Sequence, residues 1–387
     1  MKITSFFKRI RTYLYIRVHQ VNRHEYSLVI IGHESSKTGA SLLLLSFIKE
    51  LFSRGEKPIV ILRNGGALLP DYLATSWVFY PITSKSLFRF LKKAKKHGCY
   101  SALLNTTVNG DLCPFLKDEG FNCVTLVHEL PGVITQLGLM DRAKSLASCS
   151  SSVVFPSSFV RDRFCDIVGH ITSAISIIPQ GIYSKPSTTK DKNVVRKALF
   201  PNLGNSQKII LNVGTCEKRK GFDFFVQMAC ESWKKQLPYV FVWIGQIDQF
   251  YLNEIIPNHK NPLPSNLIFP GYIPKQDVLF DYFLCADFFA LTSREEPFGT
   301  VVLNSLSVGV PVIAFKGCGG FVDVIKNRET GFLVEKGDIQ TMLSTISSAL
   351  ADEKTYFIMK QNCLMASKQY DFPKYVCSVM SLFQKKV

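Results

Sequence analysis

Residues 293–313 read Ser-Arg-Glu-Glu-Pro-Phe-Gly-Thr-Val-Val-Leu-Asn-Ser-Leu-Ser-Val-Gly-Val-Pro-Val-Ile, and this stretch decides the fold. A carboxylate pair, Glu295 and Glu296, stands before a Pro-Phe-Gly turn and an apolar stretch of helical length. A short β-branched run follows Gly309. This order of strand, polar turn, helix and strand is typical of a parallel α/β sheet, whose ligands bind at the carboxyl ends of the strands. We therefore expect Glu296 to lie at such an edge, beside a helix N-terminus that attracts anions.

The same alternation of short β-rich runs and helical stretches extends over most of the chain and predicts two doubly wound domains. A length of 387 residues also favours two domains. The strands expected in the first domain are Ser27–Ile31, Lys57–Leu62, Ser76–Tyr80, Tyr100–Leu104, Cys123–Val127, Ser152–Phe155 and Ala174–Ile178. Those expected in the second are Lys208–Val213, Tyr239–Ile244, Leu267–Phe269, Asp287–Leu291, Pro311–Ala314 and Gly331–Val334. The resulting division is a basic segment 1–25, a domain 26–183, a linker 184–207, a domain 208–370 and a C-terminal helix 371–387.

A second polar turn, residues 213–221, follows the first strand of the second domain and reads Val-Gly-Thr-Cys-Glu-Lys-Arg-Lys-Gly. Three consecutive cations beside glycines at a strand-to-helix turn suit a diphosphate, because glycine lets the backbone approach a ligand closely. Arginine can also bind phosphate in a bidentate manner. The alternative is a solvated basic loop. We expect Arg219 and Lys220 to face the Glu296 turn.

These two turns resemble the retaining nucleotide-sugar glycosyltransferases of the GT-B fold, in the family 4-like group called glycosyl transferases group 1. The resemblance covers nearly all of residues 27–384 and is most specific at 293–313. It implies two Rossmann-like domains facing a cleft, with a C-terminal helix that crosses back to the first domain. It also implies transfer of a sugar from a nucleotide-diphosphate donor with retention at the anomeric carbon.

The resemblance also assigns the donor site. Glu296 and the backbone of Phe298, Gly299 and Thr300 would hold the sugar, and position 304 would hold the ribose. Lys220 and Arg219 would receive the diphosphate next to Gly214 and Thr215, and the loop at Tyr272 and Ile273 would read the nucleotide base. An Asp-x-Asp triplet often holds the metal ion in such transfers, but the chain contains none. Lys220 and Arg219 would instead stabilise the negative charge of the departing diphosphate. We therefore expect transfer that needs neither a metal nor a cofactor.

Two turns of the first domain complete the expected site. Gly39 opens a helix after the first strand, where it would let a phosphate come close; a plain helix start explains it as well. His128 directly follows a strand, and related enzymes carry a histidine in this place, facing the reacting sugar. Glu129 would orient its imidazole or face solvent. We expect His128, Glu296, Lys220 and Arg219 to carry the catalysis.

Two departures from the family pattern leave alternatives open. Asn304 stands where the family has a second glutamate, and Thr215 stands where it has an arginine. Asparagine still forms hydrogen bonds but carries no charge. The alternatives are a catalytically weak subunit that binds nucleotide sugar or a partner transferase, and a nucleotide-sugar epimerase of the same fold.

The amino-acid composition limits the binding partners and the cellular location that we expect for the protein. The net charge of +16 fits an anionic membrane surface or a diphosphate substrate, whereas no nucleic-acid-binding motif occurs, so nucleic acid is not expected. Eleven scattered cysteines without a metal-ligand spacing indicate reduced thiols in the cytoplasm. No apolar run is long enough to span a bilayer, and no signal peptide is expected.

The first 23 residues carry six cations before the first acidic residue, Glu25, and their apolar residues recur at helical spacing. Such a segment can lie in a bilayer interface or pack on the first domain. We expect peripheral binding at the inner face of the cell membrane, with a growing glycan or lipid-linked acceptor, as in bacterial O-antigen, lipopolysaccharide or capsule-like polysaccharide synthesis.

Overall fold

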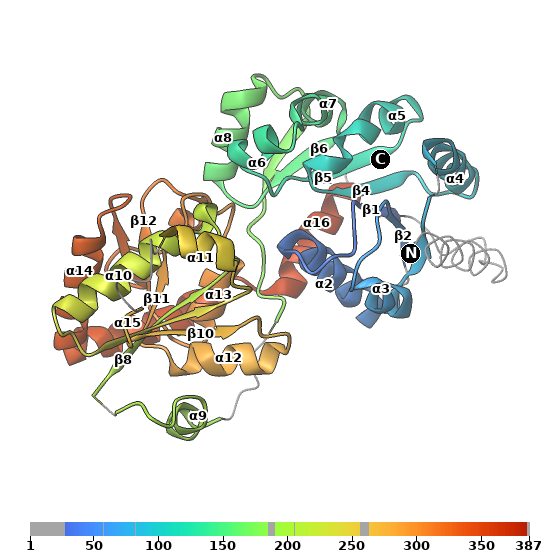
Figure 1. The fold of residues 1–387 in the computed structure, drawn as a ribbon. Coiled ribbons are helices and arrows are strands. Elements are labelled where there is room, and N and C mark those ends of the chain that lie inside the picture. Colours follow the sequence, from blue (N-terminus) through green and yellow to red (C-terminus); the bar gives the residue numbers. More distant parts are fainter. Residues whose placement is uncertain are drawn as a thin grey trace. The chain divides into compact units, whose positions relative to one another are not determined.

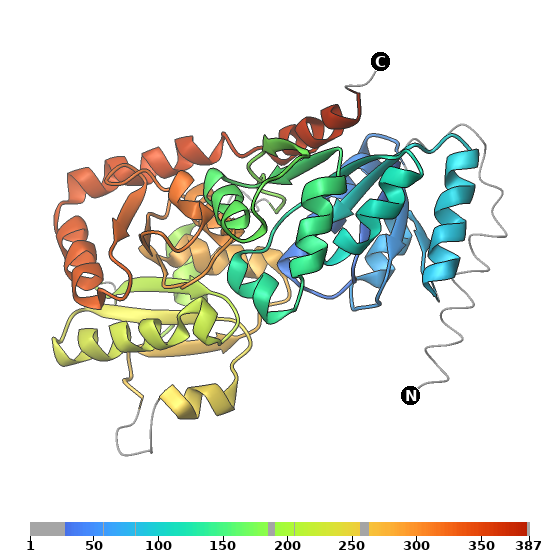
Figure 2. The same ribbon diagram turned by 90° about the horizontal axis from the view of Figure 1, so that it is seen from above.

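The computed structural model describes residues 28–56, 58–81, 83–184, 190–204, 206–255 and 263–384. The chain divides into two compact units (Figures 1 and 2). Unit 1 comprises Met1–Pro179 and Phe372–Val387, and unit 2 comprises Gln180–Asp371. Each unit is built on one parallel sheet.

The sheet of unit 1 has the strand order β3-β2-β1-β4-β5-β6-β7 within the described residues. The order reverses between β1 and β4, which pair in parallel from Leu28↔Ser101 to Ile31↔Leu104. The strands are β1 (Leu28–Gly32), β2 (Ile59–Leu62), β3 (Trp77–Phe79), β4 (Ser101–Asn105), β5 (Asn122–Leu126), β6 (Ser152–Phe155) and β7 (Ala174–Ile177). The helices are α2 (Gly39–Ser53), α3 (Leu69–Thr75), α4 (Ser84–Lys96), η1 (Thr107–Leu112), α5 (Cys113–Asp118), α6 (Pro131–Gln136), α7 (Met140–Cys149) and α8 (Ser158–Val168).

The sheet of unit 2 has the order β10-β9-β8-β11-β12-β13 within the described residues, and it reverses between β8 and β11. The strands are β8 (Lys208–Val213), β9 (Tyr239–Ile244), β10 (Leu267–Gly271), β11 (Phe288–Leu291), β12 (Val312–Phe315) and β13 (Gly331–Val334). The helices are α9 (Lys192–Leu199), η2 (Lys218–Lys220), α10 (Phe222–Lys234), α11 (Gln249–Ile255), α12 (Gln276–Cys285), α13 (Thr300–Ser307), η3 (Gly320–Asp323), α14 (Ile339–Ala351) and α15 (Glu353–Ser367).

The central strands are largely buried, which explains why their sequences are mostly apolar. β1 reads LVIIG and β9 reads YVFVWI, and every residue of both is buried. Helices cover both faces of such parallel sheets, so their strands show no polar alternation. All thirteen predicted strands are present, with ends that differ by at most two residues.

The last helix, α16 (Phe372–Gln384), belongs to unit 1 although the chain reaches it from unit 2. It packs on α2 and β5. Tyr375 meets Phe47 edge-on at 6.3 Å between ring centroids, and Arg54 donates a hydrogen bond to the Pro373 carbonyl at 3.1 Å. The predicted pair of Rossmann-like sheets with a returning C-terminal helix is confirmed.

One part of the predicted linker is a helix. Residues 192–199 form α9, because Asp191 caps it by accepting hydrogen bonds from the Asn193 and Val194 amides. The polar composition of Ser184–Asn193 hid this helix start. The predicted basic segment 1–25 lies outside the described residues. No helix among the described residues is long and apolar enough to cross a membrane.

Candidate functional site

The two predicted polar turns of unit 2 flank the point where its strand order reverses. Residues 214–221 follow β8, and residues 292–299 follow β11, its neighbour in the sheet. Ligands of open α/β sheets bind outside the carboxyl ends of the strands at such a reversal. Both predicted turns therefore lie at the edge of the sheet where ligands bind in open α/β folds.

Lys220 and Glu296 meet at the centre of this region. The Lys220 Nζ contacts the Glu296 Oε2. Their side chains are only 18% and 11% exposed, so little water competes with the pair. The Lys220 stem lies against Gly214, where a Cβ would be 3.5 Å from Cγ and Cδ. The structure thus brings together the cation and the carboxylate that the sequence singled out.

Gly221 allows the two turns to approach. It adopts a left-handed conformation, with φ of +68°, and a Cβ on it would lie 1.8 Å from the Thr292 carbonyl oxygen. The Thr292 hydroxyl donates a hydrogen bond to the Gly221 carbonyl at 2.9 Å. The Arg294 amide donates to the Arg219 carbonyl at 2.8 Å. Backbone contacts thereby fix the position of the cationic turn.

Arg219 is held within this turn by two oxygens. Its guanidinium donates to the Glu217 carboxylate at 2.6 Å and to the Glu295 carbonyl at 3.1 Å. One third of its side chain is exposed. A ligand phosphate would therefore meet Arg219 as a partly neutralised cation.

Arg294 is a residue of this region that sequence reasoning missed. It forms a bidentate pair with Asp223 at 2.6 Å for both contacts and stacks over the Phe224 ring at 3.9 Å. The hydrogen bond to Asp223 raises the pKa of Arg294 above its usual value. Asp223 lies 71 residues away along the chain, so no local pattern could have revealed this pair.

The start of α13 offers backbone donors to a ligand. Gly299 is its N-cap, with φ of +77°, and no side chain caps the helix. Uncapped amides at a helix N-terminus favour anions. Thr300 hydrogen-bonds Tyr183, while the Phe298 side chain is buried in the core. Asn304 is half-buried one turn further along α13.

The remaining predicted donor residues lie at other strand ends of unit 2. Thr215 is exposed in the turn after β8. Tyr272 is 54% exposed and Ile273 packs against the core, both directly after the edge strand β10. β9 separates β10 from β8 in the sheet.

In unit 1, His128 follows β5 and contacts Asn105, the last residue of β4. Its Nε2 lies 2.8 Å from the Asn105 Oδ1. Glu129 neither orients the imidazole nor faces solvent, the two alternatives predicted from the sequence. Its Oε2 is buried and accepts hydrogen bonds from the Thr107 amide and hydroxyl and from the His128 amide. Glu129 therefore holds the backbone of the turn, and Asn105 holds the imidazole.

This geometry fixes the tautomer of His128. The Asn105 Nδ2 donates to the Ala40 carbonyl at 3.0 Å, and a carbonyl can only accept. The Asn105 Oδ1 must then face His128, so Nε2 carries the proton and Nδ1 does not. Burial lowers the pKa of His128 to about 4; nearby Glu129 opposes this change and His33 adds to it. His128 is a neutral imidazole at pH 7.

Two further features surround the reversal point of unit 1. Thr106, directly after β4, has φ of +76°, which is rare for a β-branched residue. Its hydroxyl lies 3.3 Å from the His33 Nδ1. Gly39 begins α2, and a Cβ there would meet nothing within 4 Å. Backbone conformation therefore does not demand glycine at position 39.

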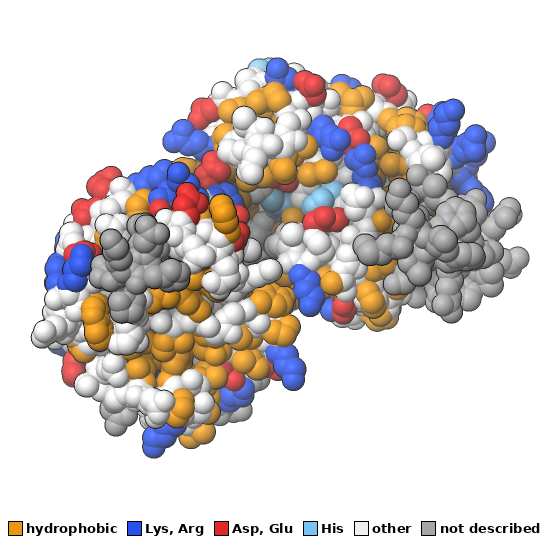
Figure 3. All heavy atoms as spheres, viewed as in Figure 1, with side chains coloured by type: hydrophobic (Ala, Val, Ile, Leu, Met, Phe, Trp, Pro, Cys, Tyr) orange, Lys and Arg blue, Asp and Glu red, His pale blue; other side chains and the backbone are white. Residues whose placement is uncertain are grey.

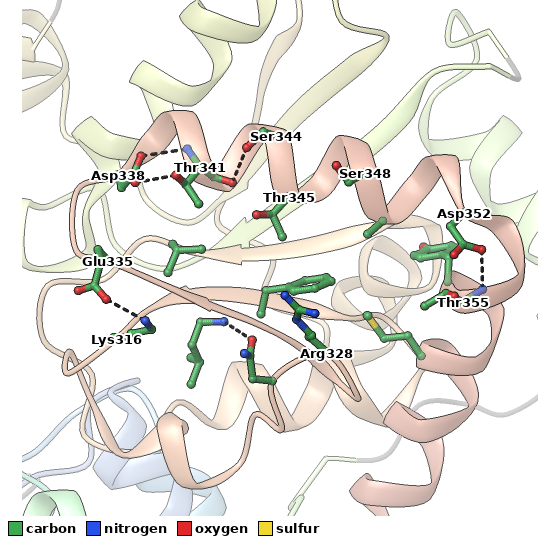
Figure 4. Close-up of a pocket in the computed structure, with 17 residues that line it drawn as sticks. Lys316, Arg328, Glu335, Asp338, Thr341, Ser344, Thr345, Ser348, Asp352 and Thr355 are labelled. Atoms are coloured by element: carbon green, nitrogen blue, oxygen red, sulfur yellow. Dashed lines mark hydrogen bonds and ion pairs between the residues drawn. The ribbon is translucent and has the colours of Figure 1, made fainter.

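Among the described residues, no group of three or more His, Cys, Asp or Glu side chains could hold a metal ion. All eleven cysteines are free. A pocket of about 570 Å³ lies between β13, α14 and α15, where Arg328 faces a row of Ser and Thr side chains of α14 (Figure 4). It contains none of the predicted site residues.

Known proteins resemble this chain in sequence and in fold. Residues 196–363 match the family described as "Glycosyl transferases group 1". A processive diacylglycerol alpha-glucosyltransferase of Acholeplasma laidlawii is 29% identical over 144 residues, which cover 37% of this chain and 42% of the relative. The chain spans about half or less of the length of the curated relatives it matches first.

Two solved structures resemble the whole chain. Anabaena HepE in complex with UDP-glucose has a TM-score of 0.77 and 19% identity, covering 94% of this chain and all of HepE. WaaG, a glycosyltransferase involved in lipopolysaccharide biosynthesis, has a TM-score of 0.72 and 14% identity, covering 93% of this chain and all of WaaG. The chain has the GT-B fold of these proteins, and its residues 196–363 carry the glycosyl transferases group 1 match.

Proposed function

We propose that the protein is a retaining glycosyltransferase that moves a sugar from a nucleotide-diphosphate donor to a growing glycan or lipid-linked acceptor. The observation that carries this proposal is the Lys220–Glu296 pair at the reversal point of unit 2. Further support comes from the group 1 match, which includes both residues, and from the UDP-glucose complex of HepE.

The proposed chemistry follows from the charges. Breaking the glycosyl–phosphate bond leaves negative charge on the nucleotide diphosphate, and fixed cations lower the energy of that transition state. Lys220 and Arg219 would meet this charge, so the proposed transfer needs no divalent metal. Glu296 would bind sugar hydroxyls, because an ionised carboxylate accepts hydrogen bonds strongly.

Other residues of unit 2 would hold the rest of the donor. The amides of Phe298, Gly299 and Thr300, at the uncapped start of α13, would face the sugar and phosphate. Asn304 would bind the ribose. The backbone after β8 and after β10 would approach the phosphates and the base, at Gly214 and Thr215 and at Tyr272 and Ile273 respectively.

His128 of unit 1 would contact the reacting sugar or acceptor. It would do so as a neutral imidazole whose Nε2 donates to the Asn105 side chain. Gly39 would let a phosphate approach the start of α2, since no side chain fills that space.

The proposed pathway is assembly of a surface polysaccharide, lipopolysaccharide or glycolipid at the cytoplasmic face of the cell membrane. Support comes from the names of two similar proteins, one acting on diacylglycerol and the other involved in lipopolysaccharide biosynthesis. The eleven free thiols fit a reducing compartment.

The test is a donor assay with purified protein. UDP-, GDP-, ADP- and dTDP-linked sugars are offered with membrane lipid extract, and release of nucleoside diphosphate is followed with time. We expect turnover with at least one donor, and NMR of the product should show the anomeric configuration of the donor retained. An inverted product would refute retention, and a donor that is bound without any transfer or hydrolysis would refute the enzyme.

Two residues favour a second candidate, a weakly active subunit that binds nucleotide sugar or a partner transferase. Asn304 lacks the charge of the family glutamate, and Thr215 lacks that of the family arginine. Restoring them in Asn304→Glu and Thr215→Arg separates the two functions. Transfer that appears only after restoration supports the weak subunit. A bound ligand at a hundred times its Kd stabilises the protein by about 2.7 kcal/mol, so a thermal shift detects donor binding in either case.

A further inference from the structure

The cavity of about 570 Å³ between β13, α14 and α15 differs in chemistry from the charged surface of unit 2. On the face that Figure 3 shows, unit 2 carries Lys and Arg side chains interspersed with Asp and Glu side chains. The cavity is instead lined mainly by hydroxyl and apolar groups, and we call it the α14 groove (Figure 4). It follows α14 from Thr341 to Asp352 over about 16 Å. Its volume is typical of a ligand site.

Hydroxyl groups form one wall of the α14 groove. Thr341, Ser344, Thr345 and Ser348 recur at a spacing of three or four residues along α14, so they share one side of the helix. Within the described parts of the chain, the hydroxyls of Thr345 and Ser348 form no hydrogen bond with another protein group. Both hydroxyls are therefore available to a ligand, as donors and as acceptors.

Apolar side chains form the floor of the α14 groove. They are Phe332 and Val334 of β13, Ala349 of α14, and Tyr356 and Met359 of α15. Phe332 and Tyr356 are half-buried, so part of each ring is exposed. The Tyr356 ring is held in place, because its hydroxyl donates a hydrogen bond to the Asp287 carbonyl at 2.7 Å. A fixed and partly exposed ring can receive an apolar face of a ligand.

Arg328 stands opposite the hydroxyl wall (Figure 4). Its side chain is exposed, and its guanidinium forms neither an ion pair nor a hydrogen bond with any described residue. The other charged side chains of the groove have partners. Lys316 pairs with Glu335 at 2.8 Å, and Asp338 and Asp352 cap α14 and α15. The N–H groups of Arg328 are thus available to a ligand in the groove.

The α14 groove does not suit a peptide strand, although β13 is the last strand of its sheet. An edge strand can pair with an extended peptide through main-chain hydrogen bonds. Here the Leu333 amide donates to the Asn327 Oδ1 at 3.2 Å, and the Gly331 carbonyl accepts from the Arg328 amide at 2.7 Å. The turn before β13 therefore occupies groups that the strand would offer, and a peptide would have to displace it.

We propose that the α14 groove binds a glycan chain, at a site separate from the predicted donor and acceptor residues. A sugar ring has hydroxyl groups around its rim and C–H groups on its faces, so it needs both hydrogen-bonding and apolar partners. The hydroxyl wall and Arg328 supply the first kind, and the rings of Phe332 and Tyr356 supply the second. The inference rests on the proposed function, in which a growing glycan is the acceptor. The groove would keep hold of that chain between successive transfers.

The test measures glycan binding by the full-length protein without any sugar donor. An array of immobilised neutral and uronic acid-containing glycans, from monosaccharides to octasaccharides, finds the probes that bind, and isothermal titration calorimetry measures their Kd.

Two variants alter the groove. Arg328→Gly removes the guanidinium and keeps the backbone conformation, because φ of Arg328 is +67° and glycine adopts positive φ readily. Thr345→Gln together with Ser348→Gln fills the groove with longer side chains that favour a helix. Lys354→Ala is the matched control, since Lys354 is an exposed cation of α15 that does not line the groove. Thermal midpoints check that each variant is folded.

We expect Arg328→Gly to weaken glycan binding about tenfold, because it removes hydrogen bonds from a charged group. The double Gln variant should abolish binding, and the control should bind normally. Affinity should rise from monosaccharide to tetrasaccharide, because the groove is longer than one sugar ring.

The proposal is overturned if no glycan binds, if the groove variants bind as tightly as the unaltered protein, or if the control loses as much as they do. Peptides of a random library that bind the unaltered protein but not the groove variants would assign the groove to a peptide instead. Because no donor is present, the two proposals fail separately. A protein that binds glycan without transferring sugar would refute the enzyme and leave this inference standing.

Discussion

Unit 1 and unit 2 are both built on a parallel sheet whose strand order reverses once, but the side chains near that reversal differ in chemistry. In unit 2 the site is ionic, with Lys220 against Glu296 and Arg219 beside it. In unit 1 the side chain that the sequence singled out is an imidazole of low pKa, held by the Asn105 amide, and the nearby charges are the carboxylates of Glu34 and Glu129. Under the proposed function, the ionic pair of unit 2 would meet the charged leaving group, and the imidazole of unit 1 would meet the uncharged sugar or acceptor.

The largest effect is expected from a substitution in the ionic pair of unit 2, Lys220 and Glu296. Lys220→Ala should lower turnover by two to three orders of magnitude, because removing one pre-aimed charge costs ~3–4 kcal/mol of transition-state stabilisation. Lys218→Ala is the matched control, since Lys218 is an exposed cation of the same turn. Steady-state release of nucleoside diphosphate measures both. A Lys220→Ala enzyme with more than a tenth of normal turnover would contradict the assignment.

The next effect compares glycines of the two units. Gly221→Ala should destabilise the protein by at least about 2 kcal/mol, because the new Cβ meets the Thr292 carbonyl in a left-handed backbone. Gly39→Ala should change stability by less than about 1 kcal/mol, since its site is open. Urea unfolding midpoints measure both. If Gly39→Ala nonetheless weakens donor or acceptor binding, a ligand occupies that open space.

A third prediction concerns the pH dependence of stability. The pKa of His128 is about 4 in the folded chain and near 6.5 as a free side chain, so the unfolded chain binds the proton first. Stability from this group is present above pH 6.5 and is lost as the pH falls towards 4. Relative to His128→Gln, the protein should lose about 2 kcal/mol between pH 7 and 4.5. Unfolding midpoints that stay parallel over this range would show that His128 is not desolvated.

The smallest effect tests what keeps the His128 imidazole neutral. Asn105→Asp places a carboxylate at the Nε2 of His128, which stabilises the imidazolium and should raise its pKa by about one unit or more. Two-dimensional ¹H–¹⁵N NMR of the imidazole nitrogens reads both the pKa and the tautomer. Asn105→Ala is the control, because it removes the hydrogen bond without adding charge. An Nδ1-protonated ring in the unaltered protein would contradict the derived tautomer.

The sequence predicted more of the fold than of the contacts within the site. The thirteen strands could be predicted because each is a short apolar run between polar turns. Lys220 and Glu296 could be paired because the two turns directly follow strands that are neighbours in the sheet, β8 and β11. Asn105 and Arg294 could not be found this way, since their partners come from other strands and helices. Glu129 was misjudged because a buried carboxylate that binds backbone amides has the same local sequence as an exposed one. α9 was missed because its capping Asp191 lies in a polar stretch.

The return of α16 to unit 1 has a consequence for biosynthesis. Residues 372–384 leave the ribosome after all of unit 2, yet they cover α2 and β5 of unit 1, which is made before unit 2. Unit 1 must therefore wait with this apolar face exposed until α16 has been synthesised, which makes it a natural client for chaperones during that interval. A stop codon shortly before residue 372 would thus damage unit 1, although it lies beyond the whole of unit 2.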